Sequence, residues 1–305
     1  MTDYNLLTYA DDTGRARAGI RVGDQVLDLA KAGLDTDSTL NVLGAWATME
    51  PKLKALADEV AAKSARLASA IKPLSTTKLM APILYPAGIF CAAANYTDHM
   101  KEMSGREPPD KAVTRPYFFA KTTAHSIIAT GDAIRLPKIS KQVDWEIEIG
   151  VVIGKPARSV KEADAMDYVA GYTIMNDLSL RDQGSRTDWN FRVDWFAHKS
   201  FDGSAPMGPW ITPKSQIKDI NNVALKLWVN DTLMQDSSSK FMYFNIPEQI
   251  AYLTERLTLR PGDIISTGTP SGVGRPRGIF LKPGDTVTME VEGIGQMKNP
   301  VVQGE

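Results

Sequence analysis

The sequence has 305 residues, 43% of them hydrophobic, which is enough for one large domain, or one large and one small, with a buried core. Its 35 lysines and arginines nearly balance 36 acidic residues, and a net charge of -1 gives no global field for binding nucleic acid or an anionic membrane. The single cysteine, Cys91, excludes an intrachain disulfide and a multi-cysteine zinc site.

The first residues, Met-Thr-Asp-Tyr-Asn, lack the basic and apolar segments of a signal peptide, so we do not expect secretion by that route. Residues 79 to 95 form the one long uncharged stretch, but two prolines interrupt it and it is shorter than the roughly 20 apolar residues of a membrane span. Together with the lone cysteine, these features predict a cytoplasmic protein.

The first 75 residues show a strand pattern followed by a helix pattern. Turn residues such as Asp-Asp-Thr-Gly separate three short strand-like runs, and Pro51 is placed to open a helix with one apolar face. The expected strands are 4–10, 16–22 and 25–29, and the expected helices are 38–49 and 51–71. We therefore predict a small α/β domain at 1–75, with its boundary in 72–82, before a catalytic domain at 76–305.

From residue 83 onward, short β runs dominate and few helices interrupt them. The expected strands are 83–94, 117–120, 132–136, 146–153, 169–176 and 223–229, and the main expected helices are 160–168 and 246–254. A regular βαβ alternation is absent, which disfavours a doubly wound sheet. The predicted fold class is α+β, mostly β.

Two acids, Glu146 and Glu148, interrupt an apolar, β-branched strand. Because side chains alternate faces along a strand, both carboxylates point the same way, and two buried like charges need a compensating cation. Oxygen ligands without a neighbouring histidine or cysteine suit Mg²⁺, Mn²⁺ or Ca²⁺. Asp177, at the end of the strand 169–176, is the candidate third ligand.

A polar segment, residues 95–116, is a candidate mobile loop over a site. If it is helical, His99 and Glu102 share a face, and the acid can orient the imidazole as a base toward water. Cys91 could serve as a nucleophile for His99, but a buried inert thiol fits its apolar strand better. We expect the other histidines, His125 and His198, to be structural.

Lys199 and the glycine-rich segment 266–274 complete the set of candidates. A lysine beside a metal can stabilise an oxyanion, and the backbone around Gly268, with the Thr269 hydroxyl, can donate hydrogen bonds to a carboxylate. The glycine spacing and Pro276 fit neither a dinucleotide fingerprint nor a P-loop.

Several ordered motifs over about residues 80 to 300 resemble the fumarylacetoacetate hydrolase superfamily. They are Glu146-Ile-Glu148, Gly-Tyr-Thr-Ile-Met-Asn-Asp177-Leu-Ser-Leu-Arg181-Asp, Lys199-Ser-Phe-Asp, Pro206-Met-Gly-Pro-Trp-Ile and Thr267-Gly-Thr-Pro-Ser-Gly-Val-Gly. The resemblance implies a mixed β-roll catalytic domain, a homodimer, and an Mg²⁺ or Mn²⁺ site made by the three acids. Ala92, seven residues ahead of His99, indicates the acylpyruvase-like branch, since the eponymous hydrolase has an aspartate there.

The resemblance also implies roles for individual residues. His99 and Glu102 would form a lid dyad, and Lys199 would contact substrate oxygens. The further expected substrate contacts are Tyr96, Arg181, Gly268 and Thr269. Many members carry a substrate-binding glutamine at the position of Gly184, and the aromatic stretch 184–197 is also unusual. That stretch either shapes a different pocket or packs at a dimer interface.

The resulting hypothesis is a metal-dependent hydrolase of a 2,4-dioxo acid of the acylpyruvate type. His99 would activate water, and the metal with Lys199 would stabilise the enolate left after carbon-carbon cleavage. The alternative is an oxaloacetate decarboxylase or tautomerase, or an isomerase of an oxo-diacid in aromatic degradation, which uses the same enolate without attack by water. A metal-stabilised ligand-binding protein without turnover is the non-enzymatic alternative.

Overall fold

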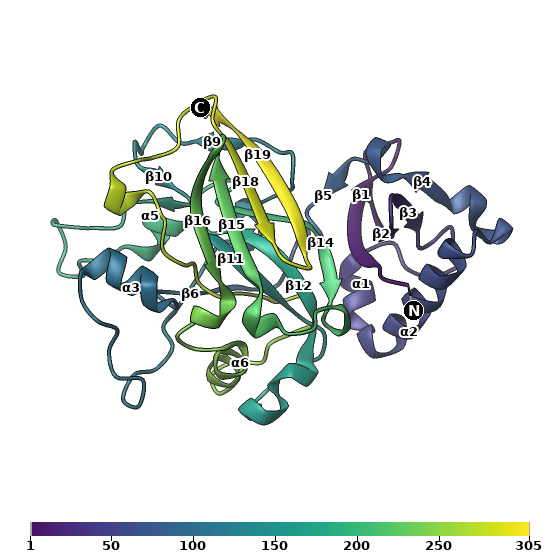
Figure 1. Cartoon of the computed structure of the whole chain (residues 1–305), viewed down its shortest axis with the longest axis horizontal. Coiled ribbons are helices and arrows are strands. Elements are labelled where there is room, and N and C mark those ends of the chain that lie inside the picture. The colour runs from purple at the N-terminus through teal and green to yellow at the C-terminus, as the bar shows by residue number, and fades with distance from the viewer. Residues whose placement is uncertain (1, 305) are drawn as a thin grey trace.

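The computed structural model describes residues 2–304, and most of its regular structure is β (Figure 1). The larger sheet has 12 strands, with the order β4-β3-β2-β1-β14-β12-β11-β17-β6-β7, β5 beside β1, and β8 beside β14. A five-stranded sheet has the order β16-β15-β18-β19-β9. The predicted class, mixed sheets with few helices, is confirmed. Among the described residues, no helix is long and apolar enough to cross a membrane.

The strands of the first half are β1 (Asn5–Ala10), β2 (Ala16–Val22), β3 (Gln25–Asp28), β4 (Ile71–Pro73), β5 (Leu79–Met80), β6 (Ile89–Ala92), β7 (Phe118–Ala120), β8 (Ile127–Ile128), β9 (Ile134–Leu136) and β10 (Val143–Asp144). Those of the second half are β11 (Ile147–Ile153), β12 (Val169–Asn176), β13 (Ser179–Leu180), β14 (Ala205–Pro213), β15 (Ala224–Val229), β16 (Thr232–Ser238), β17 (Ile264–Ser266), β18 (Thr286–Val291) and β19 (Gly295–Gln303). The α-helices are α1 (Thr39–Gly44), α2 (Trp46–Ala61), α3 (Thr97–Ser104), α4 (Thr123–Ser126), α5 (Trp195–Lys199) and α6 (Ile246–Thr254).

The strand β11 lies within the part of the chain predicted to be the catalytic domain. All seven of its residues are buried, and it pairs in antiparallel fashion with β12 on one side and β17 on the other. On one face of β11, Ile147, Ile149, Val151 and Ile153 share one apolar core with residues of β15, β18 and β19 in the five-stranded sheet. Figure 1 shows these strands stacked against β11 and β12. Glu146, just before β11, and Glu148, its second residue, are therefore held by two closely packed layers of strands.

The N-terminal strands lie at one side of the molecule, next to β14 (Figure 1). The predicted meander is present as β1, β2 and β3, but both predicted helices have wrong bounds. The first ends at Gly44, and α2 already begins at Trp46 and contains Pro51. The helix α2 ends at Ala61, because Lys63 has a left-handed φ of 56°, and residues Ala65–Ala70 form a 3-10 helix instead. The division after residue 75 stays a prediction.

Two further predicted elements differ from the structure. The run 83–94 contains only the short strand β6, because a proline at position 86 has no N–H to donate to a ladder. The segment expected to be a helix at 160–168 is a 3-10 helix over Glu162–Tyr168. Neither difference moves the acids of the candidate site.

Candidate active site

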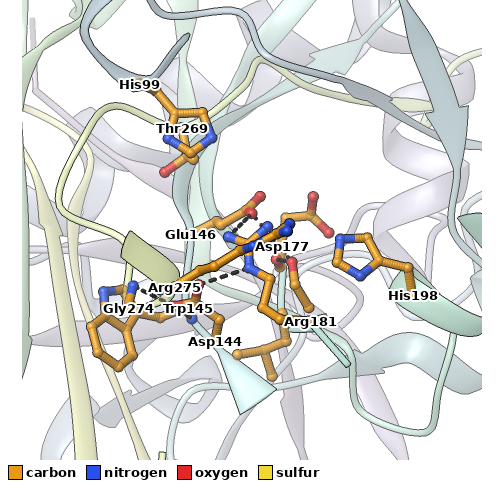
Figure 2. Close-up of polar contacts among 12 residues, drawn as sticks. His99, Asp144, Trp145, Glu146, Asp177, Arg181, His198, Thr269, Gly274 and Arg275 are labelled. Atoms are coloured by element: carbon orange, nitrogen blue, oxygen red, sulfur yellow. Dashed lines mark hydrogen bonds and ion pairs between the residues drawn. The ribbon is translucent and has the colours of Figure 1, made fainter. Parts of the chain in front are cut away.

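Three buried acids meet where β11 begins and β12 ends. Glu146 directly precedes β11, Glu148 is its second residue, and Asp177 follows β12. The antiparallel pairing of Ile147 with Asn176 brings the two strand ends together, and each acid offers an oxygen within 4.8 Å of the others. Their exposed fractions are 5%, 1% and 1%. The predicted cluster of carboxylates is thus present in the structure, and Figure 2 shows two of its members, Glu146 and Asp177.

The donor set fits a hard divalent cation. All three candidate ligands are carboxylates, and neither histidine nor cysteine belongs to the group, which favours Mg²⁺, Mn²⁺ or Ca²⁺ over zinc. Glu148 accepts hydrogen bonds from Ser266 Oγ (2.5 Å) and the Gly268 backbone N–H (2.8 Å) through Oε2 alone. Its other oxygen therefore remains available to a cation.

Two lysines neutralise part of this negative charge. Lys199 Nζ lies 2.8 Å from Glu146 Oε2 and 2.6 Å from Asp177 Oδ2, so it bridges two of the candidate ligands. Lys121, which the sequence analysis did not single out, donates to Asp177 Oδ1 (2.5 Å) and to the Leu178 carbonyl (3.0 Å). Its side chain is fully buried, so the site holds more positive charge than predicted.

Arg181 connects the cluster to Asp144, another buried acid. The guanidinium donates from Nε to Asp144 Oδ2 (2.8 Å) and from Nη2 to Glu146 Oε1 (2.7 Å). Asp144 also accepts the backbone N–H groups of Gly274 (2.7 Å) and Arg275 (3.1 Å), as Figure 2 shows. This chain of contacts ties the glycine-rich segment to the acids.

The pKa values of the two glutamates move in opposite directions. Burial raises the pKa of Glu146, but the Lys199 ammonium and the Arg181 guanidinium outweigh burial and hold that pKa below its usual value. Burial, together with the negative charges of Asp177 and Glu146, raises the pKa of Glu148 well above its usual value. A cation at the site would relieve the conflict at Glu148.

The predicted dyad lies on α3, next to the glycine-rich segment. His99 is buried, and its Nδ1 lies 3.7 Å from Glu102 Oε2, too far for a hydrogen bond; that nitrogen has no hydrogen-bond partner in the structure. Glu102 instead accepts the backbone N–H of Gly272 at 3.0 Å. Asp98 accepts the hydroxyl of Ser271 at 2.9 Å, so α3 is docked on this segment at two points.

A cavity of about 500 Å³ adjoins the acids, and most of the predicted residues line it. These are His99, Glu146, Glu148, Asp177, Arg181, Lys199 and Thr269. Tyr96, Glu102 and Gly268 are not in the lining. The Tyr96 hydroxyl is buried without a partner, and Gly268 contributes only its N–H to Glu148. Thr269 already donates its hydroxyl to the Ile147 carbonyl (2.9 Å).

Several residues of the unusual stretch 184–197 also line the cavity. They are Gly184, Ser185, Arg192, Val193 and Trp195. His198, which the sequence predicted to be structural, lines it as well. The structure thus gives this stretch a place in the pocket wall. Nothing in the local sequence marks Lys121 or His198 as part of the site. Lys121 reaches Asp177 across 56 residues of sequence, and His198 reaches the Leu180 carbonyl across 18.

Comparisons with known proteins agree on one family. The model of the fumarylacetoacetate (FAA) hydrolase C-terminal domain matches residues 88–302. The oxaloacetate tautomerase fahd2, mitochondrial, of Xenopus laevis is 40% identical over 233 residues, which are 75% of this chain and 69% of the relative. The oxaloacetate tautomerase FAHD2A, mitochondrial, of Homo sapiens is 38% identical over 237 residues, which are 76% of this chain and 72% of the relative.

Solved structures also match over nearly the full chain. Maleylpyruvate hydrolase from Sphingobium sp. SYK-6, in complex with manganese (II) ion and pyruvate, has a TM-score of 0.76 and 29% identity, with 99% of this chain and 100% of that chain covered. A putative HpcE protein from Mycobacterium smegmatis has a TM-score of 0.82 and 29% identity, with 98% and 100% covered. These likenesses agree with the cluster of carboxylates and the mostly β fold.

Proposed function

Because this chain belongs to the fumarylacetoacetate hydrolase superfamily, we propose that it is a metal-dependent enzyme that interconverts the keto and enol forms of oxaloacetate or a similar 2-oxo acid. The observation that carries this proposal is the buried cluster of Glu146, Glu148 and Asp177, which lines the cavity and contacts the ammonium groups of Lys121 and Lys199. The tautomerases that are about 40% identical to this chain support oxaloacetate as the substrate.

The residues of the cavity suit an anionic substrate whose negative charge increases during the reaction. A divalent ion held by the three acids would supply Lewis acidity toward the 2-oxo group. Lys199 is a buried cation at the same place, and it stabilises negative charge that develops on a substrate oxygen. Burial lowers the pKa of Lys199, but Asp177 and Glu146 outweigh burial and raise it, so the side chain stays an ammonium at neutral pH.

Hydrolysis of an acylpyruvate is the second candidate function, and His99 favours it. The imidazole lines the cavity, and Glu102 on the next turn of α3 lies within 3.7 Å of it. A small side-chain movement would close this gap to a hydrogen bond and orient His99 as a base toward water. The maleylpyruvate hydrolase with a similar structure also supports this candidate.

A product screen separates tautomerisation, decarboxylation and hydrolysis, and it tests the proposal. The protein is incubated with oxaloacetate and with a panel of 2-oxo and 2,4-dioxo acids, with Mg²⁺ or Mn²⁺ and then with a chelator, and the products are identified by NMR. Faster keto-enol equilibration of oxaloacetate supports the tautomerase, carbon dioxide release indicates a decarboxylase, and two acid products indicate the hydrolase. Turnover that is unchanged after thorough metal removal would reject all three readings.

The remaining expectations about partners and compartment stand as proposals. We propose that the ligand is a small 2-oxo or 2,4-dioxo acid, that the chain forms a homodimer, and that it binds neither nucleic acid nor membrane. A cytoplasmic location is proposed because the one cysteine, Cys91, is a free thiol in the structure. Fractionation of cells that express the full chain tests the location.

A further inference from the structure

His198 is the second imidazole of the cavity, and one of its nitrogens is committed to the backbone. Its Nδ1 lies 2.8 Å from the carbonyl oxygen of Leu180, and because a carbonyl can only accept, Nδ1 carries the proton. In a neutral imidazole the other nitrogen, Nε2, then has a free lone pair. The side chain is 8% exposed and belongs to the cavity lining, next to Lys199.

The surroundings hold the ring in this orientation. A Cβ atom at Gly184 would lie 2.8 Å from His198 Nδ1, so the ring occupies space that only a glycine leaves free. The indole of Trp195 packs edge-on against the ring, with centroids 6.0 Å apart. Asp194 caps α5 by accepting the Ala197 N–H (2.9 Å), which fixes the short helix that carries His198. The imidazole is therefore pre-positioned rather than free to rotate.

The charged groups around His198 keep it neutral. Burial lowers its pKa to about 4, and the positive charges of Lys199 and Arg181 act in the same direction, whereas the hydrogen bond to the Leu180 carbonyl and the negative charge of Glu146 act against them. At neutral pH the ring is thus a base without a charge. The neighbouring cations destabilise the protonated ring, so it readily passes the proton to another acceptor.

We infer that His198 carries the proton in enolisation, an inference that rests on the proposed function. Its Nε2 takes a proton from C3 of the 2-oxo acid; the electrons of the broken C–H bond form the C2–C3 double bond, and the carbonyl π electrons move to the 2-oxo oxygen. The same proton then passes from Nε2 to that oxygen to give the enol. Figure 2 shows His99 and His198 on different sides of Glu146 and Asp177, so each imidazole can serve its own step.

Proton exchange at C3 tests this assignment directly. Metal-loaded protein is incubated in D₂O with 2-oxobutyrate, and the loss of the C3 proton signal is followed by NMR. Replacement of His198 by asparagine, which cannot accept the proton, is expected to slow exchange by roughly 100-fold or more. His125→Asn is the matched control, because His125 is exposed on α4 and does not line the cavity.

The outcomes separate this inference from the proposed function. If the wild-type protein exchanges the C3 proton and a folded His198→Asn variant does so at the same rate, His198 is not the proton carrier. If exchange is lost in His99→Asn and kept in His198→Asn, the carrier is His99. If the wild-type protein enolises none of the 2-oxo acids, the proposed function fails first. His198→Gln serves where the asparagine variant does not fold.

A second measurement is independent of turnover. The chain has three histidines, so ¹⁵N NMR of histidine-labelled protein gives three imidazoles to assign. We expect His198 to keep its proton on Nδ1 and to stay neutral between pH 5 and 8. The Nε2 resonance should shift when metal-loaded protein binds oxalate, an unreactive mimic of the enolate. A proton found on Nε2, or an Nε2 signal that oxalate leaves unmoved, would overturn the inference.

Discussion

Glu148 carries the sharpest electrostatic conflict among the residues of the site. It is 1% exposed, it faces two other carboxylates, and its hydrogen bonds come only from Ser266 and Gly268. Lys199 and Lys121 lie closer to Glu146 and Asp177 than to this side chain. Glu148 therefore lowers the stability of the metal-free protein. Binding of a cation by its carboxylate is the simplest explanation for an acid at this position.

Replacing Glu148 with glutamine should therefore change two properties in opposite directions. The free energy of unfolding of the metal-free protein should rise by about 1 to 2 kcal/mol, because glutamine neither carries a buried like charge nor has to hold a proton above the ordinary pKa of a carboxyl, and its amide oxygen keeps both hydrogen bonds. Affinity for Mn²⁺ should fall roughly 100-fold or more, since a ligand is lost. Urea denaturation and calorimetric titration measure the two changes. Equal Mn²⁺ affinity in the two proteins would remove Glu148 from the metal site.

The same glutamate predicts a pH dependence. Its pKa is raised in the folded state, so above the ordinary value near 4.5 the unfolded chain has lost a proton that the folded metal-free chain still holds. The stability of the metal-free protein should therefore fall as pH rises through and above that value, and the Glu148→Gln variant should lack this component. The measurement is the difference between the two unfolding free energies as a function of pH. A constant difference would contradict the assignment.

The cluster of buried acids could be predicted from sequence, whereas several residues around it could not. Glu146 and Glu148 stand out because strand periodicity puts two acids on one buried face. Lys121 reaches Asp177 across 56 residues of sequence, and no local pattern marks that contact. Tyr96, which the family resemblance implies as a substrate contact, lies outside the cavity lining.

At the level of elements, the helix α3 is held over the cavity by the glycine-rich segment. Asp98 accepts hydrogen bonds from the backbone N–H (3.3 Å) and hydroxyl (2.9 Å) of Ser271, and Glu102 accepts the Gly272 N–H (3.0 Å). These contacts join two parts of the chain that are 170 or more residues apart. They hold α3 against the glycine-rich segment, and the role of α3 as a lid stays a prediction.

Replacing Asp98 with alanine should loosen this lid. Loss of the two bonds to Ser271 should speed amide hydrogen exchange in α3 by roughly 10-fold, which corresponds to about 1 to 1.5 kcal/mol. Lys101→Ala on the same helix is the control, because that side chain pairs only with the exposed Glu107. Equal exchange rates in the Asp98→Ala variant and in the wild-type protein would show that the docking contacts do not hold the helix.

The N-terminal strands depend on a second buried acid. Asp28, at the end of β3, accepts a hydrogen bond from the Tyr9 hydroxyl (2.5 Å) and two from Arg17 (3.0 and 2.8 Å). Burial raises the pKa of Asp28, but Arg17 and Tyr9 outweigh burial and lower it. Its contribution to stability is therefore present at neutral pH and is lost as pH falls below the ordinary value near 3.8.

Asp28→Asn should lower the free energy of unfolding by about 2 kcal/mol at pH 7. This is less than the roughly 3 to 5 kcal/mol typical of breaking a buried ion pair, because Arg17 is partly exposed to solvent. The difference between variant and wild type should shrink as pH falls toward 3. Asp12→Asn is the control, because Asp12 is exposed and its ion pair with Lys72 is long, at 3.8 Å. A variant as stable as the wild-type protein at pH 7 would contradict this reading.

The type of most elements, helix or strand, could be predicted from the sequence. Their first and last residues could not, because apolar spacing does not mark where an element ends. The meander β1 to β3 follows from strand periodicity and turn residues. The predicted helix 51–71 fails because its apolar spacing continues past Ala61 into a 3-10 helix, whose Leu67 and Ala70 are also buried. Apolar spacing alone does not distinguish one long helix from a helix followed by a turn.

At the scale of the whole molecule, the aromatic stretch 184–197 leaves large apolar side chains on the surface. Trp189, Phe191 and Phe196 are 64%, 74% and 69% exposed, and all belong to this stretch. Exposed groups of this kind often mark an interaction surface. The proposed homodimer offers a second copy of the chain to cover them.

We predict that the chain has the mass of a dimer in solution and that Phe191→Asp shifts it toward the monomer. Burial of an added charge at an apolar interface disfavours association, whereas an exposed position outside the interface tolerates it. Leu233→Asp is the control, at a residue that is 42% exposed on β16. Light scattering after size exclusion measures the masses. A wild-type monomer would reject the dimer, and an unchanged Phe191→Asp dimer would place its interface elsewhere.

The overall strand arrangement was beyond what the sequence could predict. Local patterns predict strands, but the order of the sheets follows from pairings such as β17 with β6, which joins Ile264 to Ile89. Partners so far apart in sequence are chosen by burial in the whole core rather than by any local signal. The mostly β class was nevertheless predictable, because few segments carry a helical period.

The central claim is that the three buried acids bind a metal ion that assists enolisation of a 2-oxo acid. The most direct test measures keto-enol interconversion of oxaloacetate by metal-depleted protein, by the same protein after stepwise addition of Mn²⁺, and by Glu148→Gln under identical conditions. We predict that the wild-type rate rises with bound Mn²⁺ and saturates, while the variant stays near the uncatalysed rate. A full rate in the metal-depleted protein, or no acceleration at any Mn²⁺ concentration, would contradict the claim.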